Sequence, residues 1–267
     1  MCRVIAIANH KGGVAKTTTV ASLGIGLANK GYKVLLVDTD GQADLTKALW
    51  RDKAGHLVHP STLTPNFVTM MNNIITKQDF DPHKAVLHHP EGVDLIPSNI
   101  KASNLELALI GTMSRELVLD KCIRPLKEDY DYIVIDSLPS LDLITVNVLA
   151  CADTVLIPVQ AEFLAVEDLE DLIGTIQDVK EMVNPKLSIE GILITMADPR
   201  TNYGQVIKKE IIKNYSEYVR VFECPIPRSV RASEISALGI SIYKHAPGSK
   251  VERAYSSLVE EVIQNGK

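Results

Sequence analysis

The sequence predicts a doubly wound α/β fold, in which a mostly parallel sheet has helices on both faces. Short apolar runs rich in β-branched residues recur along the chain, and segments with a helical pattern separate them. Runs whose two faces are both apolar are typical of parallel strands that helices cover on each side. Because strand and helix alternate, we expect right-handed crossovers and a ligand site at the carboxyl ends of the strands.

Seven apolar runs are expected to form strands. They cover residues 3–9, 33–40, 93–98, 132–137, 154–159, 191–196 and 220–227. Helices are expected over TTTVASLGIGLANKG (17–31), which begins with threonine hydroxyls, and over SRELVLDKCIRPLKED (114–129), whose apolar residues have roughly helical spacing. Further helices are expected over 162–183 and near the end of the chain, over 251–267.

Residues 51–90 fit this alternation poorly because they are rich in Pro, His, Asn and Asp. We interpret them as an irregular insertion or flexible connection, with one helix near 67–77, inside a single domain that spans residues 1–267. Five of the seven histidines lie in this stretch. Their spacing repeats no known metal-binding pattern, so we expect surface histidines there rather than a metal site.

Composition excludes several classes of protein. The four cysteines, at 2, 122, 151 and 224, are too far apart for a C-x-x-C metal pair or a disulfide framework, so reduced thiols are expected. The first residues lack the layout of a cleavable signal, and no apolar run approaches the roughly 18 residues that a membrane-spanning helix needs. A cytoplasmic protein is therefore expected.

The net charge of −5 argues against a uniformly basic nucleic-acid binder, but the charge is unevenly distributed. Between Arg200 and Arg253 there are ten Lys or Arg residues and five Glu residues, so this window is basic on an otherwise acidic chain. Such asymmetry permits a local anion-binding patch. From the charge count alone, a solvated surface is the simpler interpretation.

The stretch HKGGVAKTT (10–18) nearly matches the phosphate-binding pattern G-x-x-x-x-G-K-[ST]. Lys16 and Thr17 match, whereas His10 and Ala15 stand where the pattern has glycines. The stretch follows an apolar strand and precedes a helix, a context in which backbone N–H groups hold phosphate at a helix N-terminus. We therefore expect a nucleotide site made of Lys11, Gly12, Gly13, Val14, Ala15, Lys16, Thr17 and Thr18.

We expect a different role or effect for each of three residues in this loop. Lys16 would pair with the β- and γ-phosphates of ATP, and the Thr17 hydroxyl would bind Mg²⁺. If position 15 needs a positive φ, Ala15 costs on the order of 1 kcal/mol there, and its methyl group would crowd the phosphates. ATP and Mg²⁺ are thus the expected cofactors, and the rate of hydrolysis stays open.

Lys11 lies five residues before Lys16, on the rising side of the loop. With this lysine, HKGGVAKTT resembles the deviant Walker A loop, K-G-G-x-G-K-T, of the ParA/MinD family of P-loop ATPases. In that family the first lysine reaches across a nucleotide-sandwich homodimer to the partner's phosphates. The resemblance implies the P-loop NTPase fold, dimerisation on ATP binding, and catalytic roles for both Lys11 and Lys16.

The end of the second expected strand resembles another motif of that family. VLLVDTDGQADLT (34–46) is similar to D-x-D-P-Q-G-N, and Gly41, Ala43 and Asp44 depart from it. The resemblance implies that Asp40 orients the attacking water and is catalytic. It also implies that Asp38 helps to hold the metal region.

The expected strand at 132–137 ends at a further candidate metal residue. YDYIVIDSLPSLDLITVNVL (130–149) resembles the Walker B segment D-x-P-P-S-L followed by T-x-N-A-L, with Leu138 in place of the first proline. The resemblance implies that Asp136 holds Mg²⁺ through water. Strand-end carboxylates also serve as simple helix caps, but the phosphate loop upstream favours the metal role.

Two stretches of the C-terminal half resemble ParA proteins in particular. MADPRTNYG (196–204) is similar to the family element around D-x-R-T-N, and CPIPRSVRASEISALGISI (224–242) is similar to I-P-R-N-x-R-x-S-E-A-P-x-x-G. The likeness is nearest to small ParA proteins that lack an N-terminal helix-turn-helix. It implies that an ATP dimer binds nonspecific DNA through the following residues: Arg200, Arg231 and their neighbours Arg228 and Lys250.

Other interpretations of these residues and of the chain stay open. One alternative is that Arg228 or Arg231 forms a structural ion pair with Glu234 or contacts nucleotide. Another is that the protein is an ATP-gated scaffold that positions a protein cargo with slow turnover, or a metabolic P-loop enzyme. Dethiobiotin synthetase and nitrogenase iron protein share the loop, but the cysteines here lack the iron protein's context.

The resemblance also implies partners and a location. A ParB-like activator, a DNA cargo and association with the nucleoid follow from it. The end of the chain carries Glu260 and Glu261, which oppose anionic lipid, so the membrane helix of MinD-like proteins is not expected. The acidic helix over 162–183 lies near the dimer and partner surface in the family, although its charges also suit a solvated face.

Overall fold

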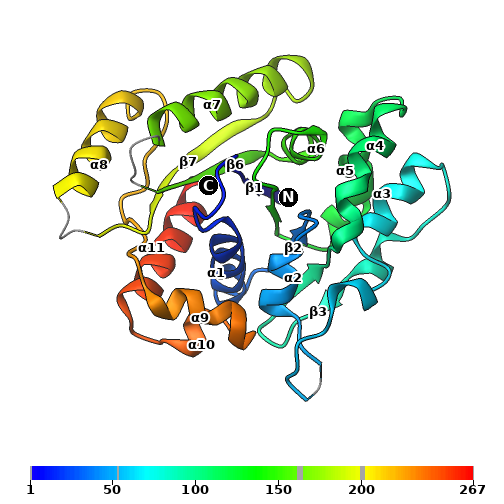
Figure 1. Cartoon of the computed structure of the whole chain (residues 1–267), viewed down its shortest axis with the longest axis horizontal. Coiled ribbons are helices and arrows are strands. Elements are labelled where there is room, and N and C mark those ends of the chain that lie inside the picture. Colours follow the sequence, from blue (N-terminus) through cyan, green and yellow to red (C-terminus); the bar gives the residue numbers. More distant parts are fainter. Residues whose placement is uncertain (1, 53, 161–164, 199–201, 267) are drawn as a thin grey trace.

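The computed structural model describes residues 2–52, 54–160, 165–198 and 202–266. These residues form a seven-stranded sheet of order β3-β4-β2-β5-β1-β6-β7, in which β3 is antiparallel to its neighbour and every other pair is parallel. The strands are β1 (Arg3–Ile7), β2 (Val34–Asp38), β3 (Leu87–His88), β4 (Val93–Ile96), β5 (Tyr132–Asp136), β6 (Thr154–Gln160) and β7 (Ser188–Thr195). This sheet confirms the predicted doubly wound α/β fold (Figure 1).

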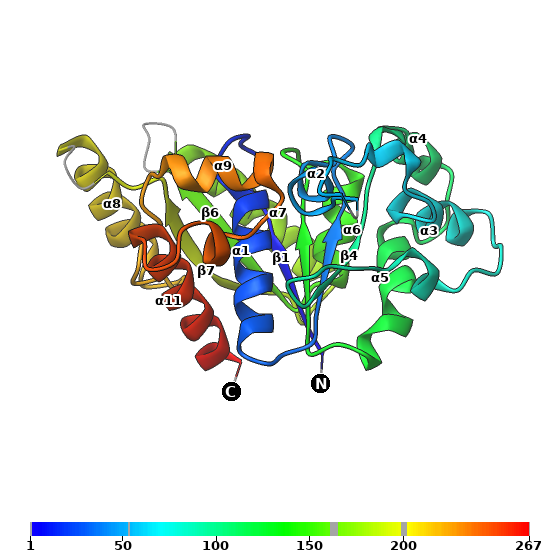
Figure 2. The same ribbon diagram turned by 90° about the horizontal axis from the view of Figure 1, so that it is seen from below.

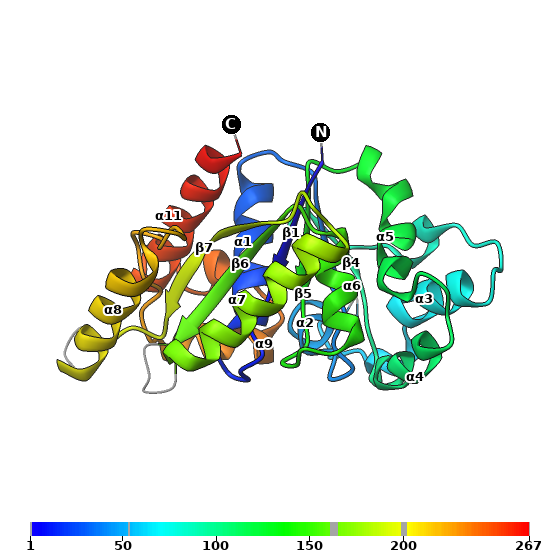
Figure 3. The ribbon, with the colours of Figure 1, turned by 90° about the horizontal axis from the view of Figure 1, so that it is seen from above.

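Helices cover both faces of the sheet (Figures 2 and 3). One face carries α3 (Phe67–Ile75), α4 (Leu105–Ile110), α5 (Val118–Ile123), α6 (Leu143–Cys151), α7 (Ala165–Met182) and α8 (Asn202–Tyr215). The other carries α1 (Lys16–Asn29), α2 (Asp44–Leu49), α9 (Val230–Leu238), α10 (Ile242–His245) and α11 (Lys250–Asn265). Short 3₁₀ turns, η1 to η5, lie at Pro60–Thr62, Pro82–Ala85, Ile100–Asn104, Arg115–Leu117 and Arg124–Glu128.

The alternation of side chains along β1 explains why two apolar layers form. Val4 and Ala6 belong to one core cluster, whereas Ile5 and Ile7 belong to the other. Successive residues of a strand point to opposite faces, so a strand covered on both sides must be apolar throughout. Strands β2 and β5 are buried throughout, and β1 is buried except at Arg3, so local apolar patterning is strongest in these three strands.

Two predicted elements are wrong in detail. Residues 220–227 do not form a strand; they follow β7 through two isolated parallel bridges, Ile192 to Val221 and Ala197 to Pro227. Pro225 and Pro227 carry no N–H for a continuous ladder. The helix expected over 114–129 is divided into η4, α5 and η5, and Pro125, which has no N–H, accounts for the break between α5 and η5.

Residues 51–90 contain short elements that pack onto the sheet. The helix expected near 67–77 is α3, which begins at an Asn66 capping box and buries Phe67, Met70 and Met71 in the core. His83 bridges Asp81 and Asp129 with its two ring nitrogens, at 2.6 and 2.9 Å. Among the described residues, no three His, Cys, Asp or Glu side chains lie together as a metal site.

The central strands all point toward one end of the molecule. The register pairs Ile7 with Asp136 and Asp136 with Asp38, so the ends of β1, β5 and β2 are adjacent. Helices α2 and α9 lie at this end, and both chain termini lie at the opposite end (Figure 2). No helix in the described part of the chain is both long enough and apolar enough to cross a bilayer.

Candidate nucleotide-binding site

The loop between β1 and α1 has the backbone of a phosphate cradle. Gly13 and Ala15 have φ of 77° and 67°, and Ala15 is the N-cap of the 14-residue helix α1 without a side-chain cap. A Cβ built on Gly12 or Gly13 would meet nothing within 4 Å, so the loop's outer side is open. The N–H groups of the first turn of a helix lack backbone acceptors and attract an anion. Because Ala15 has a positive φ, the cost on the order of 1 kcal/mol that we expect for a side chain in this conformation applies here.

Lys16 is buried beneath this loop rather than extended into solvent. Its Nζ donates to the carbonyl oxygens of Asn9 at 2.8 Å and of Lys11 at 2.9 Å. Burial lowers the pKa of Lys16, while the nearby carboxylates of Asp136 and Asp40 oppose that shift. The ammonium group is thus held under the loop's open side, where an incoming phosphate would meet it.

Two residues that sequence reasoning missed hold this loop in place. The Asn9 side chain donates to the Pro158 carbonyl at 2.8 Å and accepts from the Lys11 N–H at 2.9 Å. The Thr195 hydroxyl, at the end of β7, donates to the Val14 carbonyl at 3.0 Å. A polar residue at the end of an apolar strand was the available signal for both, but only the fold brings β6 and β7 to the loop.

Thr17 and Asp136, each predicted separately as a metal residue, are in direct contact. The Thr17 hydroxyl donates to Asp136 Oδ2 at 2.7 Å, and the buried Asp136 Oδ1 has no hydrogen-bond partner. Burial and the neighbouring Asp38 raise the pKa of Asp136 well above its usual range. A buried carboxylate oxygen without a donor, beside a threonine hydroxyl, suits a hard cation such as Mg²⁺. The two side chains therefore fit the metal that accompanies ATP.

Asp38 has a different environment from Asp136, although the two are register partners. Its Oδ2 accepts from the Thr46 N–H at 2.8 Å and from the Thr46 hydroxyl at 2.6 Å, and its Oδ1 accepts from the Asp40 N–H at 3.1 Å. Burial raises the pKa of Asp38 to about 7. Both oxygens are thus used within the protein, and the residue anchors the start of α2.

Asp40 lies in the loop between β2 and α2, with its Oδ1 accepting from the Gln42 N–H at 2.8 Å. Burial raises its pKa, and the Lys16 charge acts in the opposite direction. The loop ends at Ala43, the α2 N-cap, which has a φ of 54°. The Asp40 carboxylate and the Lys16 ammonium group therefore influence each other's pKa, and the water-orienting role of Asp40 stays a prediction.

The structure describes three of the four predicted DNA-binding residues. Arg200 lies outside the described residues. Arg228 and Arg231 are exposed before and within α9, and Lys250 is exposed as the first residue of α11. Glu234, the alternative ion-pair partner for either arginine, instead contacts His245 Nε2 at 2.7 Å.

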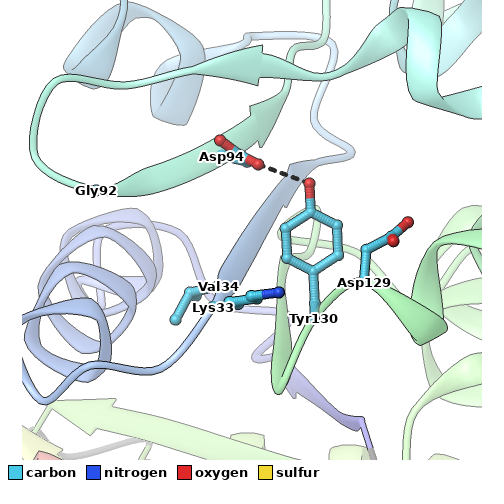
Figure 4. Close-up of a pocket in the computed structure, with 6 residues that line it drawn as sticks. All are labelled: Lys33, Val34, Gly92, Asp94, Asp129 and Tyr130. Carbon is cyan, nitrogen blue, oxygen red and sulfur yellow. Dashed lines mark hydrogen bonds between the residues drawn. The ribbon is translucent and has the colours of Figure 1, made fainter.

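The pocket in Figure 4 includes none of the predicted nucleotide-binding or DNA-binding residues. It is lined by Lys33, Val34, Gly92, Asp94, Asp129 and Tyr130. Val34 is the first residue of β2, so this pocket is at the amino ends of the strands. Its Tyr130 hydroxyl donates to Asp94 at 2.7 Å. The pocket is therefore separate from the nucleotide site.

Comparison with known proteins decides the family. A model described as an AAA domain, AAA_31, matches residues 2–189. The sporulation initiation inhibitor protein Soj of Bacillus subtilis is 39% identical over all of both chains. The chromosome-partitioning ATPase Soj of Thermus thermophilus is 36% identical over 98% of this chain and 95% of its own, and the chromosome partitioning protein ParA of Myxococcus xanthus is 36% identical over 98% and 88%.

The chain belongs to the Soj/ParA family of ATPases. Solved structures agree with this membership. Cobyrinic acid a,c-diamide synthase of Mycobacterium smegmatis, with bound ATP analogue and magnesium, is 33% identical with a TM-score of 0.83 and covers 100% of this chain and 96% of its own. McdA(D38A) of Cyanothece in complex with ATP is 26% identical with a TM-score of 0.84, over 98% and 96%.

Family membership makes this chain a P-loop ATPase whose cofactors are ATP and Mg²⁺. The resemblance drawn from the loop sequence is thereby confirmed, as are the predicted enzyme class and both cofactors. The roles of individual residues stay predictions. Their arrangement, with Lys16, Thr17, Asp40 and Asp136 around one open loop, is consistent with those roles.

Proposed function

We propose that this chain is a ParA-type partition ATPase that closes into a homodimer on ATP, binds DNA without sequence preference, and drives segregation or positioning of a DNA cargo. A ParB-like partner stimulates hydrolysis and thereby releases the dimer from DNA. The observation that carries the proposal is the placement of the phosphate loop and of the exposed Arg228 and Arg231 segment at the same end of the sheet. Full-length similarity to Soj proteins supports it.

The proposed dimer would be controlled by Lys11. Its backbone N–H donates to Asn9, and its carbonyl accepts from Lys16, so the main chain of Lys11 is fixed by the same groups that form the cradle. A lysine held in this way on an open loop can present its ammonium group to the phosphates of a facing copy. A cation delivered in trans is worth about 10³ to 10⁵ in the rate of phosphoryl transfer.

The proposed DNA contact would use the exposed basic side chains of the C-terminal half. Arg228 and Arg231 are both exposed, and Glu234 is engaged by His245 rather than by them. Exposed arginines bind the phosphate backbone without reading bases, and the affinity of such contacts falls steeply with salt. Binding of this kind would place the protein on the nucleoid, within the cytoplasm.

The test is binding to random-sequence duplex DNA without nucleotide, with ADP-Mg²⁺ and with ATP-Mg²⁺, at low and moderate salt. We expect binding only with ATP-Mg²⁺, and we expect Arg231→Ala to weaken it and to reduce the salt slope by about 1. Arg124→Ala is the matched control, because Arg124 is an exposed arginine that pairs with Asp120 and lies in η5, which precedes the amino end of β5. Equal loss in both variants would contradict a specific role for Arg231.

Two other functions are favoured by particular similarities. The likeness to McdA supports an ATP-gated scaffold that positions a protein cargo. The likeness to a protein named as a cobyrinic acid diamide synthase supports a metabolic P-loop enzyme. An ATP dimer without DNA binding in any nucleotide state would favour the scaffold. Absence of both DNA binding and an ATP dimer would favour the metabolic enzyme.

A further inference from the structure

We propose that Arg51 is a positioning residue that transmits the nucleotide state of the Asp40 loop to the basic segment at residues 228–231. The connection runs through α2, whose first turn contacts the nucleotide site and whose last turn contacts α9. The part of the proposal that concerns DNA rests on the proposed function. The mechanical coupling between the two segments does not depend on what the basic segment binds.

The first turn of α2 is tied to the metal region. Helix α2 follows the Asp40 loop directly, with Ala43 as its N-cap. Thr46, in its first turn, donates both its N–H and its hydroxyl to Asp38, which is adjacent to Asp136 in the sheet. Because α2 has only six residues, a shift of this loop when phosphate binds moves the helix as one unit.

The last turn of α2 is tied to α9 through one guanidinium group. Arg51 Nη1 donates to the carbonyl oxygens of Lys47 and Trp50, and Arg51 Nη2 donates to those of Ser236 and Ala237 at 3.0 Å each. These are the unpaired carbonyl groups that helix C-termini present, and they carry partial negative charge. The planar fork of an arginine is suited to joining two such ends, whereas a lysine offers a single point.

Helices α2 and α9 also pack directly against each other. Leu45 and Leu49 of α2 share a core cluster with Ile235 of α9. Gly239, the C-cap of α9, has a φ of 69°, and a Cβ built on it would lie 2.6 Å from Arg51 Nε. A Cβ at this position would clash with Arg51 unless the arginine side chain moved, so glycine suits both the backbone and the contact, and the guanidinium group lies directly against the end of α9. The basic segment begins two residues before the other end of the same helix.

A second contact holds α9 without involving α2. Glu91 accepts from the Ser241 N–H at 3.0 Å and from the Ser241 hydroxyl, and thereby fixes the connection between α9 and α10 to the turn between β3 and β4. Loss of this contact should loosen α9 equally in every nucleotide state. Loss of Arg51 should instead remove the dependence on nucleotide. Substitutions at Arg51 and Glu91 therefore distinguish nucleotide-dependent coupling from simple structural support of α9.

The experiment is hydrogen–deuterium exchange of the full chain with ADP-Mg²⁺ and with AMPPNP-Mg²⁺, read at residues 40–49 and 228–239. In the wild type we expect the two nucleotides to give different protection at both segments. In Arg51→Ala we expect the difference to persist at 40–49 and to vanish at 228–239. Glu91→Gln should raise exchange at 228–239 with both nucleotides and keep the difference, and Arg124→Ala should match the wild type.

Three results would overturn the coupling: no nucleotide difference at 228–239 in the wild type, an unchanged difference in Arg51→Ala, or the same behaviour in Arg51→Ala and Glu91→Gln. Affinity for random duplex DNA gives an independent measurement. We expect Arg51→Ala to reduce the ratio of DNA affinities in AMPPNP and ADP by about tenfold while its nucleotide affinity is retained. If the wild type binds no DNA but the exchange result holds, the coupling stands and the proposed function fails.

Discussion

Two alanines beside the nucleotide site have left-handed backbone conformations. Ala15 and Ala43 have φ of 67° and 54°, and each is the N-cap of a helix whose preceding loop carries site residues. A side chain in this region costs about 1–2 kcal/mol relative to glycine. Ala43 is almost completely buried, so packing of its methyl group offsets part of that cost. The loops thus keep the shape that glycine permits, with less stability.

Ala15→Gly tests this cost at the phosphate loop. Because glycine adopts a positive φ without strain, we expect the free energy of unfolding of the nucleotide-free protein to rise by about 1 kcal/mol. The melting temperature should rise by roughly 2–4 °C in differential scanning calorimetry. Ala28→Gly, inside α1, is the matched control and should lower the unfolding free energy by about 1 kcal/mol. A lower melting temperature for Ala15→Gly would show that the methyl contacts outweigh the strain.

Asp136 is expected to trade stability for metal binding. Its buried carboxyl group lies beside Asp38, both burial and Asp38 raise its pKa, and its Oδ1 has no donor. Asp136→Asn replaces this carboxyl group with a neutral amide, so the cost of holding an acid here is removed and we expect the metal-free protein to unfold with a free energy about 1 kcal/mol higher. Calorimetric titration should also show that Mg²⁺ no longer strengthens ATP binding. Asp120→Asn, at an acid that pairs with Arg124 outside the site, should change neither property.

At the scale of elements, single side-chain contacts determine whether a short helix is stable. Helix α2 has six residues, too few to be stable by propensity alone, and Thr46 fixes it to Asp38 and to the Ser98 N–H at 3.0 Å. Nothing in the local sequence indicates either partner, because Asp38 and Ser98 are brought to Thr46 only by the fold. The divided helix over 114–129 shows the same limit, because apolar spacing predicts a helix but not the breaks within it.

Thr46→Val keeps the shape of the side chain and removes its hydroxyl. Asp38 then loses one of its donors while it stays buried, and the Ser98 N–H loses its acceptor. We expect the free energy of unfolding in urea to fall by about 2–3 kcal/mol. Thr76→Val, at an exposed hydroxyl that contacts only the Asn72 carbonyl, should change it by less than about 0.5 kcal/mol. Equal effects would mean that Asp38 finds another donor.

At the scale of the whole molecule, the nucleotide loop and the basic segment share one end of the sheet (Figure 2). Nucleotide binding to a folded monomer raises stability by mass action, by about 2.7 kcal/mol at a hundredfold excess over Kd. Dimerisation adds a contribution that depends on protein concentration. These two contributions can be separated by a residue that acts only across the dimer.

Lys11→Ala provides that separation. We expect the variant to keep most of its ATP affinity, because Lys16 and the cradle remain, and to lose ATP-dependent dimerisation and hydrolysis. In the wild type the melting temperature with AMPPNP-Mg²⁺ should rise with protein concentration, and in Lys11→Ala it should not. Sedimentation velocity measures the dimer directly. A Lys11→Ala variant that still sediments as an ATP dimer would rule out its role in trans.

The sequence by itself determined the doubly wound sheet, the phosphate loop and its family, because strand burial and loop chemistry depend on local patterns. It also indicated that Thr17 and Asp136 approach the same metal. The single domain and the insertion at 51–90 stay predictions. Only the tertiary structure decided that Asn9 and Thr195 hold the loop, that Asp38 anchors α2, and that Arg51 joins α2 to α9. Their partners are distant in sequence, and no local periodicity encodes which strand ends and helix ends become neighbours.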